Sequence, residues 1–175
     1  MRSAHCRCAG GRAATLQVGY RELVTSDERH LREFWAEARA AHPELPAELP
    51  QAWAFGATPE HADALLGLVL EGVKTATASA LGDYETGEEQ VPCVGELSII
   101  LDGAGEPRAV LEVTSIDIVP FDQVTAEHAH AEGEDDRSLD SWRRIHERFW
   151  AAYSDQGFTP DMLVVCEAFR LVHSR

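Results

Sequence analysis

Lys74 is the residue of this sequence whose type most clearly suggests proton-transfer chemistry. It is the only lysine among fifteen basic residues, and all the others are arginine. A guanidinium, with a pKa above about 12, cannot give up its proton near neutral pH, whereas an amine can do so in the right environment. Two explanations therefore stay open: this position needs an amine that can lose a proton, or Lys74 is the survivor of a compositional bias toward arginine.

Lys74 lies three residues before Thr77, in a segment that follows a predicted helix and begins a predicted strand. Within one strand this odd spacing would put the two side chains on opposite faces. They converge only if the chain turns before the strand, which Gly72 permits. The hypothesis is that Thr77 is a nucleophile and Lys74 its proton acceptor, which requires the lysine pKa to fall from about 10.4 toward about 7 to 8. The alternative is a solvated lysine after a helix end.

An acidic segment, residues 132–136, is the natural source of a carboxylate for such a site because it holds four acids in five residues. Clustered acids raise one another's pKa and so provide a proton donor near neutrality. Asp135 and Asp136 precede a predicted helix, where negative charge is favourable, and we assign both to capping. Glu132 and Glu134 remain as candidate site residues.

Histidines also lie near the acidic segment. His128 and His130 form an HxH pair, which beside acids invites a metal interpretation, but on one helix the two side chains diverge. His146 falls next to the apolar stripe of the following helix and is interpreted as a helix-surface residue. The sequence contains no phosphate-binding loop or dinucleotide motif. We therefore predict no metal and no cofactor.

Composition bounds the class of protein. A chain of 175 residues that is 45% hydrophobic can bury one sizeable core. The net charge of −15 argues against extensive, sequence-blind binding to nucleic acid, which depends on many contacts from Lys or Arg to phosphate. No apolar run is long enough for a membrane helix, and residues 1–14 lack the apolar region of a secretory signal. We expect a cytoplasmic protein without a membrane partner.

Periodicity and turn residues predict an α+β domain. Residues 1–24 are expected to be poorly ordered, and residues 25–175 to form a single domain with a helical extension at 25–52. The predicted helices are 25–41, capped by Thr25, then 58–71, 125–131 and a last one capped by Asp136 or Ser138; the predicted strands are 75–80, 94–102, 108–119 and 162–172. Residues 43–51 read as a covering loop. The hairpin at 102–107 implies antiparallel pairing, so a small, partly closed barrel flanked by helices is expected.

Taken in order, several motifs resemble the ASCH domain, the activating signal cointegrator homology domain. They are the Gly-x-Lys-Thr-x-Thr motif at 72–77, the hairpin, Ala-Glu-Gly-Glu at 131–134, and a Ser-Leu-x-x-Trp helix start at 138–142. The resemblance runs from about residue 53 to the C-terminus, and the helix at 25–41 looks like the extension of a larger bacterial subgroup. It implies a PUA-like β-barrel of mixed or antiparallel strands and an association with RNA or modified nucleosides.

A small bacterial relative in this family is an amidohydrolase that deacetylates N4-acetylcytidine. Its Lys, Thr and Glu look similar to Lys74, Thr77 and Glu134, which the resemblance therefore implies as catalytic residues. The candidate substrate-binding residues are Ser79, Glu132, Trp53 and Trp142. Ser79 departs from the relative, which has an arginine there, so the substrate does not carry over. A small nucleoside-like ligand or a short RNA is the expected partner; a non-catalytic RNA- or nucleotide-binding module and a ribonuclease are the alternatives.

Overall fold

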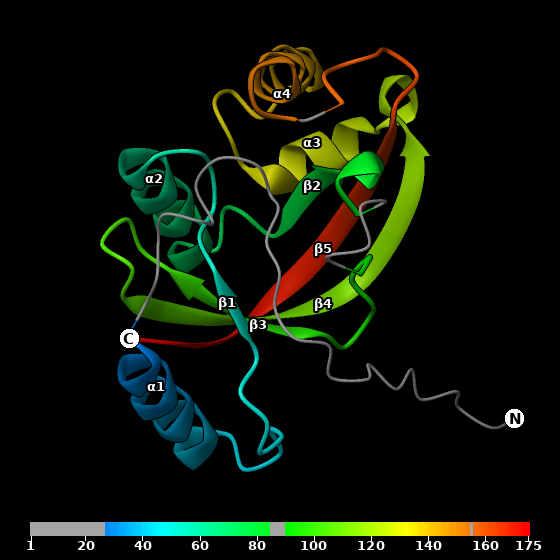
Figure 1. Ribbon diagram of the computed structural model, residues 1–175. Coiled ribbons are helices and arrows are strands. Elements are labelled where there is room, and N and C mark those ends of the chain that lie inside the picture. Colours follow the sequence, from blue (N-terminus) through cyan, green and yellow to red (C-terminus); the bar gives the residue numbers. More distant parts are fainter. Residues whose placement is uncertain (1–26, 85–89, 155) are drawn as a thin grey trace, which may run out of the picture.

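The computed structural model describes residues 27–84, 90–154 and 156–175. Figure 1 shows a curved sheet with helices at both of its ends. In chain order the elements are α1 (Glu28–Ala41), β1 (Gln51–Trp53), α2 (Pro59–Leu70), β2 (Ala76–Ala80), the short 3-10 helix η1 (Leu81–Tyr84), β3 (Leu97–Leu101), β4 (Pro107–Pro120), the 3-10 helix η2 (Phe121–Gln123), α3 (Ala126–Glu132), α4 (Leu139–Tyr153) and β5 (Leu163–Ser174).

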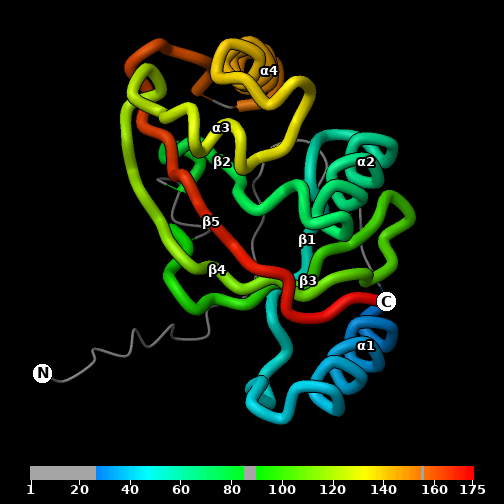
Figure 2. Tube along the Cα trace, turned by 180° about the vertical axis from the view of Figure 1, so that it is seen from behind, coloured from blue at the N-terminus to red at the C-terminus, as the bar shows by residue number. Residues whose placement is uncertain are grey.

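The sheet holds five strands in the order β1-β3-β4-β5-β2. β1 pairs with β3 in parallel, and every other pairing is antiparallel. β4 and β5 form the long central pair, which curves from the α1 end of the molecule to the α3 and α4 end (Figures 1 and 2). Register shifts after Val110 and Val113 mark irregularities that bend such a pair. The predicted α+β class, with a small partly closed barrel of mixed strands, is confirmed.

The first helix and the segment after it differ from the sequence prediction. The α1 helix begins at Glu28, and the Asp27 side chain accepts a hydrogen bond from Arg29 N, so the predicted cap at Thr25 is wrong. Thr25 and the segment 1–24 lie outside the described residues. The expected covering loop contains the strand β1, which was missed because three residues are too few to show a period and their partner, β3, is distant in sequence.

The other three α-helices match their predicted positions and caps. Thr58 caps α2, Thr125 caps α3 and Ser138 caps α4, each through a side-chain oxygen that accepts a backbone N–H of the first turn. Asp136 Oδ1 accepts from Ser138 N, and Asp135 accepts from the Ser141 hydroxyl. Ser138 is thus the N-cap residue of α4, and the two aspartates bond to the start of the helix from the turn that precedes it.

Separate apolar clusters fill the two ends of the sheet. The α1 end is packed by Phe34, Trp35 and Ala38 against Ile99, Leu101 and Val110 of β3 and β4. The α4 end is packed by Phe121, Trp142, Trp150, Val164 and Cys166. α2 contacts β3 and β5 between these ends. In the part of the chain that the structure describes, no helix combines the length and the apolar character needed to span a membrane.

Candidate functional site

The backbone turns at the end of α2 and places Lys74 ahead of the strand that follows. Gly72 has φ +72°, the left-handed conformation that glycine adopts without strain. Lys74 N then donates to Leu68 O at 3.0 Å, and Thr75 N donates to Ala131 O at 2.8 Å. β2 begins only at Ala76. Lys74 therefore precedes the strand, which is the condition under which its side chain and that of Thr77 can share one space.

The Lys74 side chain is 1% exposed and carries two ion pairs. Its Nζ lies 2.9 Å from Glu134 Oε1 and 3.0 Å from Glu132 Oε2, and it lies 5.5 Å from the centre of the Phe55 ring. Burial by itself lowers the pKa of Lys74, but attraction to Glu132 and Glu134 outweighs burial, so the pKa is raised above its ordinary value. Lys74 is therefore an ammonium at neutral pH, whereas the sequence hypothesis requires a lowered pKa.

Glu132 is buried to 1% exposure and held by donors on every side. Its Oε1 accepts from Trp142 Nε1 at 2.6 Å and from His128 Nε2 at 3.1 Å, and it lies 3.6 Å from His146 Nε2. Burial raises the pKa of this carboxyl, but Lys74, His146 and His128 outweigh burial and hold the pKa far below its usual range. Glu132 is thus an anion at neutral pH, and the other side chains are arranged around it.

His146 is a site residue that the sequence interpretation missed. Its ring is 8% exposed and stacks on Trp142 at 4.1 Å between centroids, so the predicted helix-surface position is wrong. Its Nδ1–H donates to Trp142 O at 2.9 Å, so only the doubly protonated ring carries a second hydrogen on Nε2 for Glu132. Trp142 and His146 are four positions apart, a spacing that places both on one face of a helix, and this is the signal by which the sequence could have indicated their contact.

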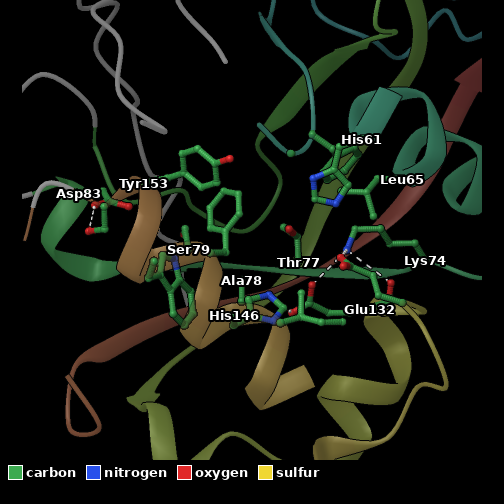
Figure 3. Close-up of a pocket in the computed structure, with 17 residues that line it drawn as sticks. His61, Leu65, Lys74, Thr77, Ala78, Ser79, Asp83, Glu132, His146 and Tyr153 are labelled. Carbon is green, nitrogen blue, oxygen red and sulfur yellow. Dashed lines mark hydrogen bonds and ion pairs between the residues drawn. The ribbon is translucent and has the colours of Figure 1, made fainter. Parts of the chain in front are cut away.

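A pocket extends from this cluster along β2, and Figure 3 shows its side chains. Lys74, Thr77 and Glu132 lie together at one end, and Ser79, Asp83 and Tyr153 lie at the other. The space amounts to about 60 Å³. The lining residues are Phe55, Gly56, His61, Leu65, Lys74, Thr77, Ala78, Ser79, Asp83, Glu132, Glu134, Ile145, His146, Phe149, Trp150, Tyr153 and Ser154.

Four of the predicted residues besides Lys74 line this pocket: Thr77, Glu134, Ser79 and Glu132. The Thr77 hydroxyl makes no hydrogen bond to another described residue, whereas the Ser79 hydroxyl is 2.8 Å from that of Tyr84. The two predicted tryptophans lie outside the lining. Trp53 packs edge-on against Phe55, and Trp142 is a buried donor to Glu132, so the geometry gives neither a direct contact with a pocket ligand.

The two histidines of the HxH pair separate as a helix requires. His128 is hydrogen-bonded to Glu132, whereas His130 accepts a hydrogen bond from the guanidinium of Arg137. Across residues 27–84, 90–154 and 156–175, no group of three or more potential ligands is arranged to hold a metal ion.

Gly133, the residue that ends α3, lies at a point with no room for a side chain. It has φ +77°, and a Cβ there would lie 2.8 Å from Val73 O. Gly72, with φ +72°, would meet nothing within 4 Å. We expect Gly133→Ala to lower the free energy of unfolding by about 2 kcal/mol more than Gly72→Ala, because both replacements strain the backbone but only the first also forces two chain segments apart.

Urea unfolding of both variants measures this difference. Equal losses for Gly133→Ala and Gly72→Ala would show that the two segments do not pack against each other as described. A side effect is expected as well: the 133 variant shifts Glu132 and Glu134 relative to Lys74, so it also loses any activity of the site.

The sequence of this domain matches a known protein family. A family model described as the ASCH domain matches residues 51–173. The chain belongs to the ASCH domain family. The ASCH domain is a PUA-like fold associated with RNA binding, and the resemblance found in the motifs at 72–77 and 131–134 is confirmed.

Two crystal structures share the ASCH fold seen here. A protein from Enterococcus faecalis V583 is 36% identical, with a TM-score of 0.74, and the match covers 83% of this chain and 89% of that one. An ASCH domain from Lactobacillus crispatus JV V101 is 28% identical with a TM-score of 0.74, covering 86% of this chain and 98% of the other. No curated protein matches the sequence.

Proposed function

We propose that this ASCH domain hydrolyses the N-acyl amide of a nucleoside-like ligand, with Thr77 as nucleophile and Lys74 and Glu134 as its proton-transfer pair. The observation that carries the proposal is the buried Lys74 ammonium between two carboxylates, in the same small pocket as a threonine hydroxyl. Nucleophile, amine and carboxylate in one cavity are the components of covalent amide hydrolysis. Family membership supports the nucleoside class of ligand.

The raised pKa of Lys74 determines how the proton must move. As an ammonium, Lys74 cannot accept the Thr77 proton until it has given one away. Glu134 is the acceptor because its Oε1 is 2.9 Å from Nζ, whereas the hydrogen-bond donors of Trp142 and His128 contact Glu132. The neutral amine then takes the hydroxyl proton as Thr77 Oγ1 attacks the acyl carbon.

The later steps close the cycle with water as co-reactant. The C–N bond breaks, the leaving amine takes a proton from the Lys74 and Glu134 pair, and the acyl group remains on Thr77 as an ester. Water then adds to the ester carbonyl, the C–O bond to Thr77 breaks, and the carboxylic acid leaves with the hydroxyl restored. Glu132 takes no part in proton transfer because Trp142 and His128 already donate to it.

The wall opposite β2 supports a planar ligand. Five residues of α4 line the pocket, and four of them carry aromatic or imidazole rings: His146, Phe149, Trp150 and Tyr153. Rings of this kind stack on nucleobases with little dependence on base identity. The small size of the pocket favours one base or nucleoside over a longer polynucleotide.

The test is incubation of the purified protein with N4-acetylcytidine and measurement of cytidine and acetate. Thr77→Val keeps the shape of the side chain but removes the nucleophile, and we expect kcat to fall at least about 100-fold. Thr114→Val, an exposed threonine on β4, is the matched control and should keep the wild-type rate. Turnover that survives Thr77→Val or Lys74→Ala would refute the mechanism.

A second candidate function, binding of a nucleoside or RNA without turnover, is favoured by one observation. Lys74 is held as an ammonium by both glutamates, which is a stable arrangement for a binding site as well. Binding that lacks turnover, weakens with salt and depends on surface arginines would support it for RNA. A ribonuclease fits less well, since no arginine is among the described residues that line the pocket.

A further inference from the structure

His146 is a buried side chain to which the proposed hydrolysis gives no role. It belongs to α4 and lines the pocket together with Lys74 and Thr77. Its Nε2 is 3.6 Å from Glu132 Oε1, so the ring lies beside the buried anion of the site, and Figure 3 shows both side chains. An imidazole in such a position is available for proton transfer.

One hydrogen bond determines which nitrogen of the His146 ring carries hydrogen. Nδ1 lies 2.9 Å from Trp142 O, and a carbonyl oxygen only accepts, so the hydrogen is on Nδ1. In the neutral ring Nε2 then holds the lone pair and is the basic atom. The ring also stacks on that of Trp142, with 21° between the two planes, which limits its rotation. The basic atom therefore has a fixed position.

Glu132 favours the uptake of a proton at Nε2 of this ring. The lone pair and the carboxylate are both acceptors, so they form a hydrogen bond only after the ring has gained a proton. The imidazolium that results lies next to an anion, which favours its charged form. Orientation through one nitrogen and stabilisation of the imidazolium by a carboxylate are what a histidine general base requires.

The second half of the proposed hydrolysis requires a proton acceptor for the attacking water. Once the amine has left, Lys74 is again an ammonium, and it accepts a proton only if Glu134 takes one first. His61 also lines the pocket, but no hydrogen bond between described side chains holds its ring. His146 has a fixed lone pair and needs no earlier proton transfer.

We propose that His146 is the general base of the second half-reaction, in which Nε2 takes a proton from the water that attacks the acyl ester on Thr77. The water oxygen bonds to the acyl carbon, and the bond from that carbon to Thr77 Oγ1 breaks. The proton on Nε2 passes to Oγ1, so both side chains end as they began and a carboxylic acid leaves. This inference rests on the proposed function because it requires the acyl ester.

Incubation of the full-chain variant His146→Gln with N4-acetylcytidine tests the proposal. We expect a stoichiometric burst of cytidine at close to the wild-type rate, followed by turnover at least about 100-fold slower than in the wild type. Intact-protein mass spectrometry should then show one acetyl group on the protein, and the added substitution Thr77→Val should abolish it. Because acylation precedes the affected step, kcat and KM should fall together and kcat/KM should stay near the wild-type value.

Two other histidines provide controls. His130→Gln changes an exposed histidine outside the pocket lining and should keep the wild-type rate without any adduct. His61→Gln tests the other imidazole of the lining, and an adduct in His61→Gln but not in His146→Gln would overturn the assignment. A loss of kcat/KM in His146→Gln as large as the loss of kcat would also overturn it, since such a loss indicates only disturbed packing against Trp142.

A measurement on the wild type needs no variant that could fail to fold. Long-range proton–nitrogen NMR spectra at neutral pH should show hydrogen on Nδ1 of His146 and none on Nε2, and hydrogen on Nε2 would overturn the base role. Hydrolysis by the wild type without an adduct in His146→Gln would remove this proposal and leave the hydrolase standing. If the wild type releases no cytidine, both proposals fail.

Discussion

Replacing Lys74 by methionine is expected to lower the free energy of unfolding by about 3 to 5 kcal/mol. Methionine fills the space of the apolar stem but leaves the carboxylates of Glu132 and Glu134 without the ammonium that both contact. Removing one partner of a buried ion pair is costly because the remaining charge stays buried without compensation. Here two carboxylates are left, and they also repel each other. Urea denaturation measures the loss.

The combined variant Lys74→Met with Glu132→Gln supplies the control. If the loss comes from uncompensated charge rather than from poor packing of methionine, removing the Glu132 charge should recover part of it, because replacing a whole buried ionic group is often nearly neutral. A double-mutant cycle gives the coupling energy directly. A single-variant loss below about 1 kcal/mol, or no recovery in the pair, would contradict the described ion pairs.

Glu132→Gln on its own is expected to cost about 3 kcal/mol at neutral pH and to change the response to acid. The folded protein holds the pKa of Glu132 below its ordinary value of 4.5, so the unfolded chain takes up this proton first as the pH falls. The contribution of Glu132 to stability is therefore fully present above about pH 4.5 and is lost as the pH falls toward the folded pKa. Below pH 4.5 the wild type should lose about 1.4 kcal/mol per pH unit more than the variant.

Unfolding free energies at a series of pH values between neutral and acid give this difference in slope. Glu127→Gln is the matched control, because Glu127 lies exposed on the same helix and its loss should leave the wild-type slope. Parallel curves for the wild type and Glu132→Gln would mean that Glu132 is not held as an anion in the folded state.

The convergence of Lys74 and Thr77 was predictable because it depends on local chemistry. A glycine that ends a helix, and a strand that begins after the lysine, are both visible in the sequence. The acidic segment was also visible, but its four carboxylates look alike in one dimension. Which of them contact Lys74 depends on how α3 packs beside β2. The sequence did not show that two carboxylates would form ion pairs with Lys74, and the hypothesis therefore required a lowered lysine pKa where these pairs raise it.

The far end of the pocket was not predictable for the same reason. Asp83 and Ser154 are separated by 71 positions and have no motif of their own; only the fold brings η1 beside the end of α4. The position of His146 was only partly predictable. The helix stripe placed it at the boundary between core and surface, but the tryptophan that covers its ring face and the buried anion beside it appear only in three dimensions.

The pairing order of the sheet also sets the time at which this pocket can form during synthesis. β2, which carries Thr77 and Ser79, hydrogen-bonds to β5, and Phe169 N donates to Thr75 O at 2.9 Å. Of the five strands of this sheet, β5 leaves the ribosome last, almost ninety residues after β2. Until it emerges, the nascent chain holds β2 without its partner, and the segment that bears the lysine has no sheet against which to settle. Assembly of the site is therefore a late event that follows translation of β5.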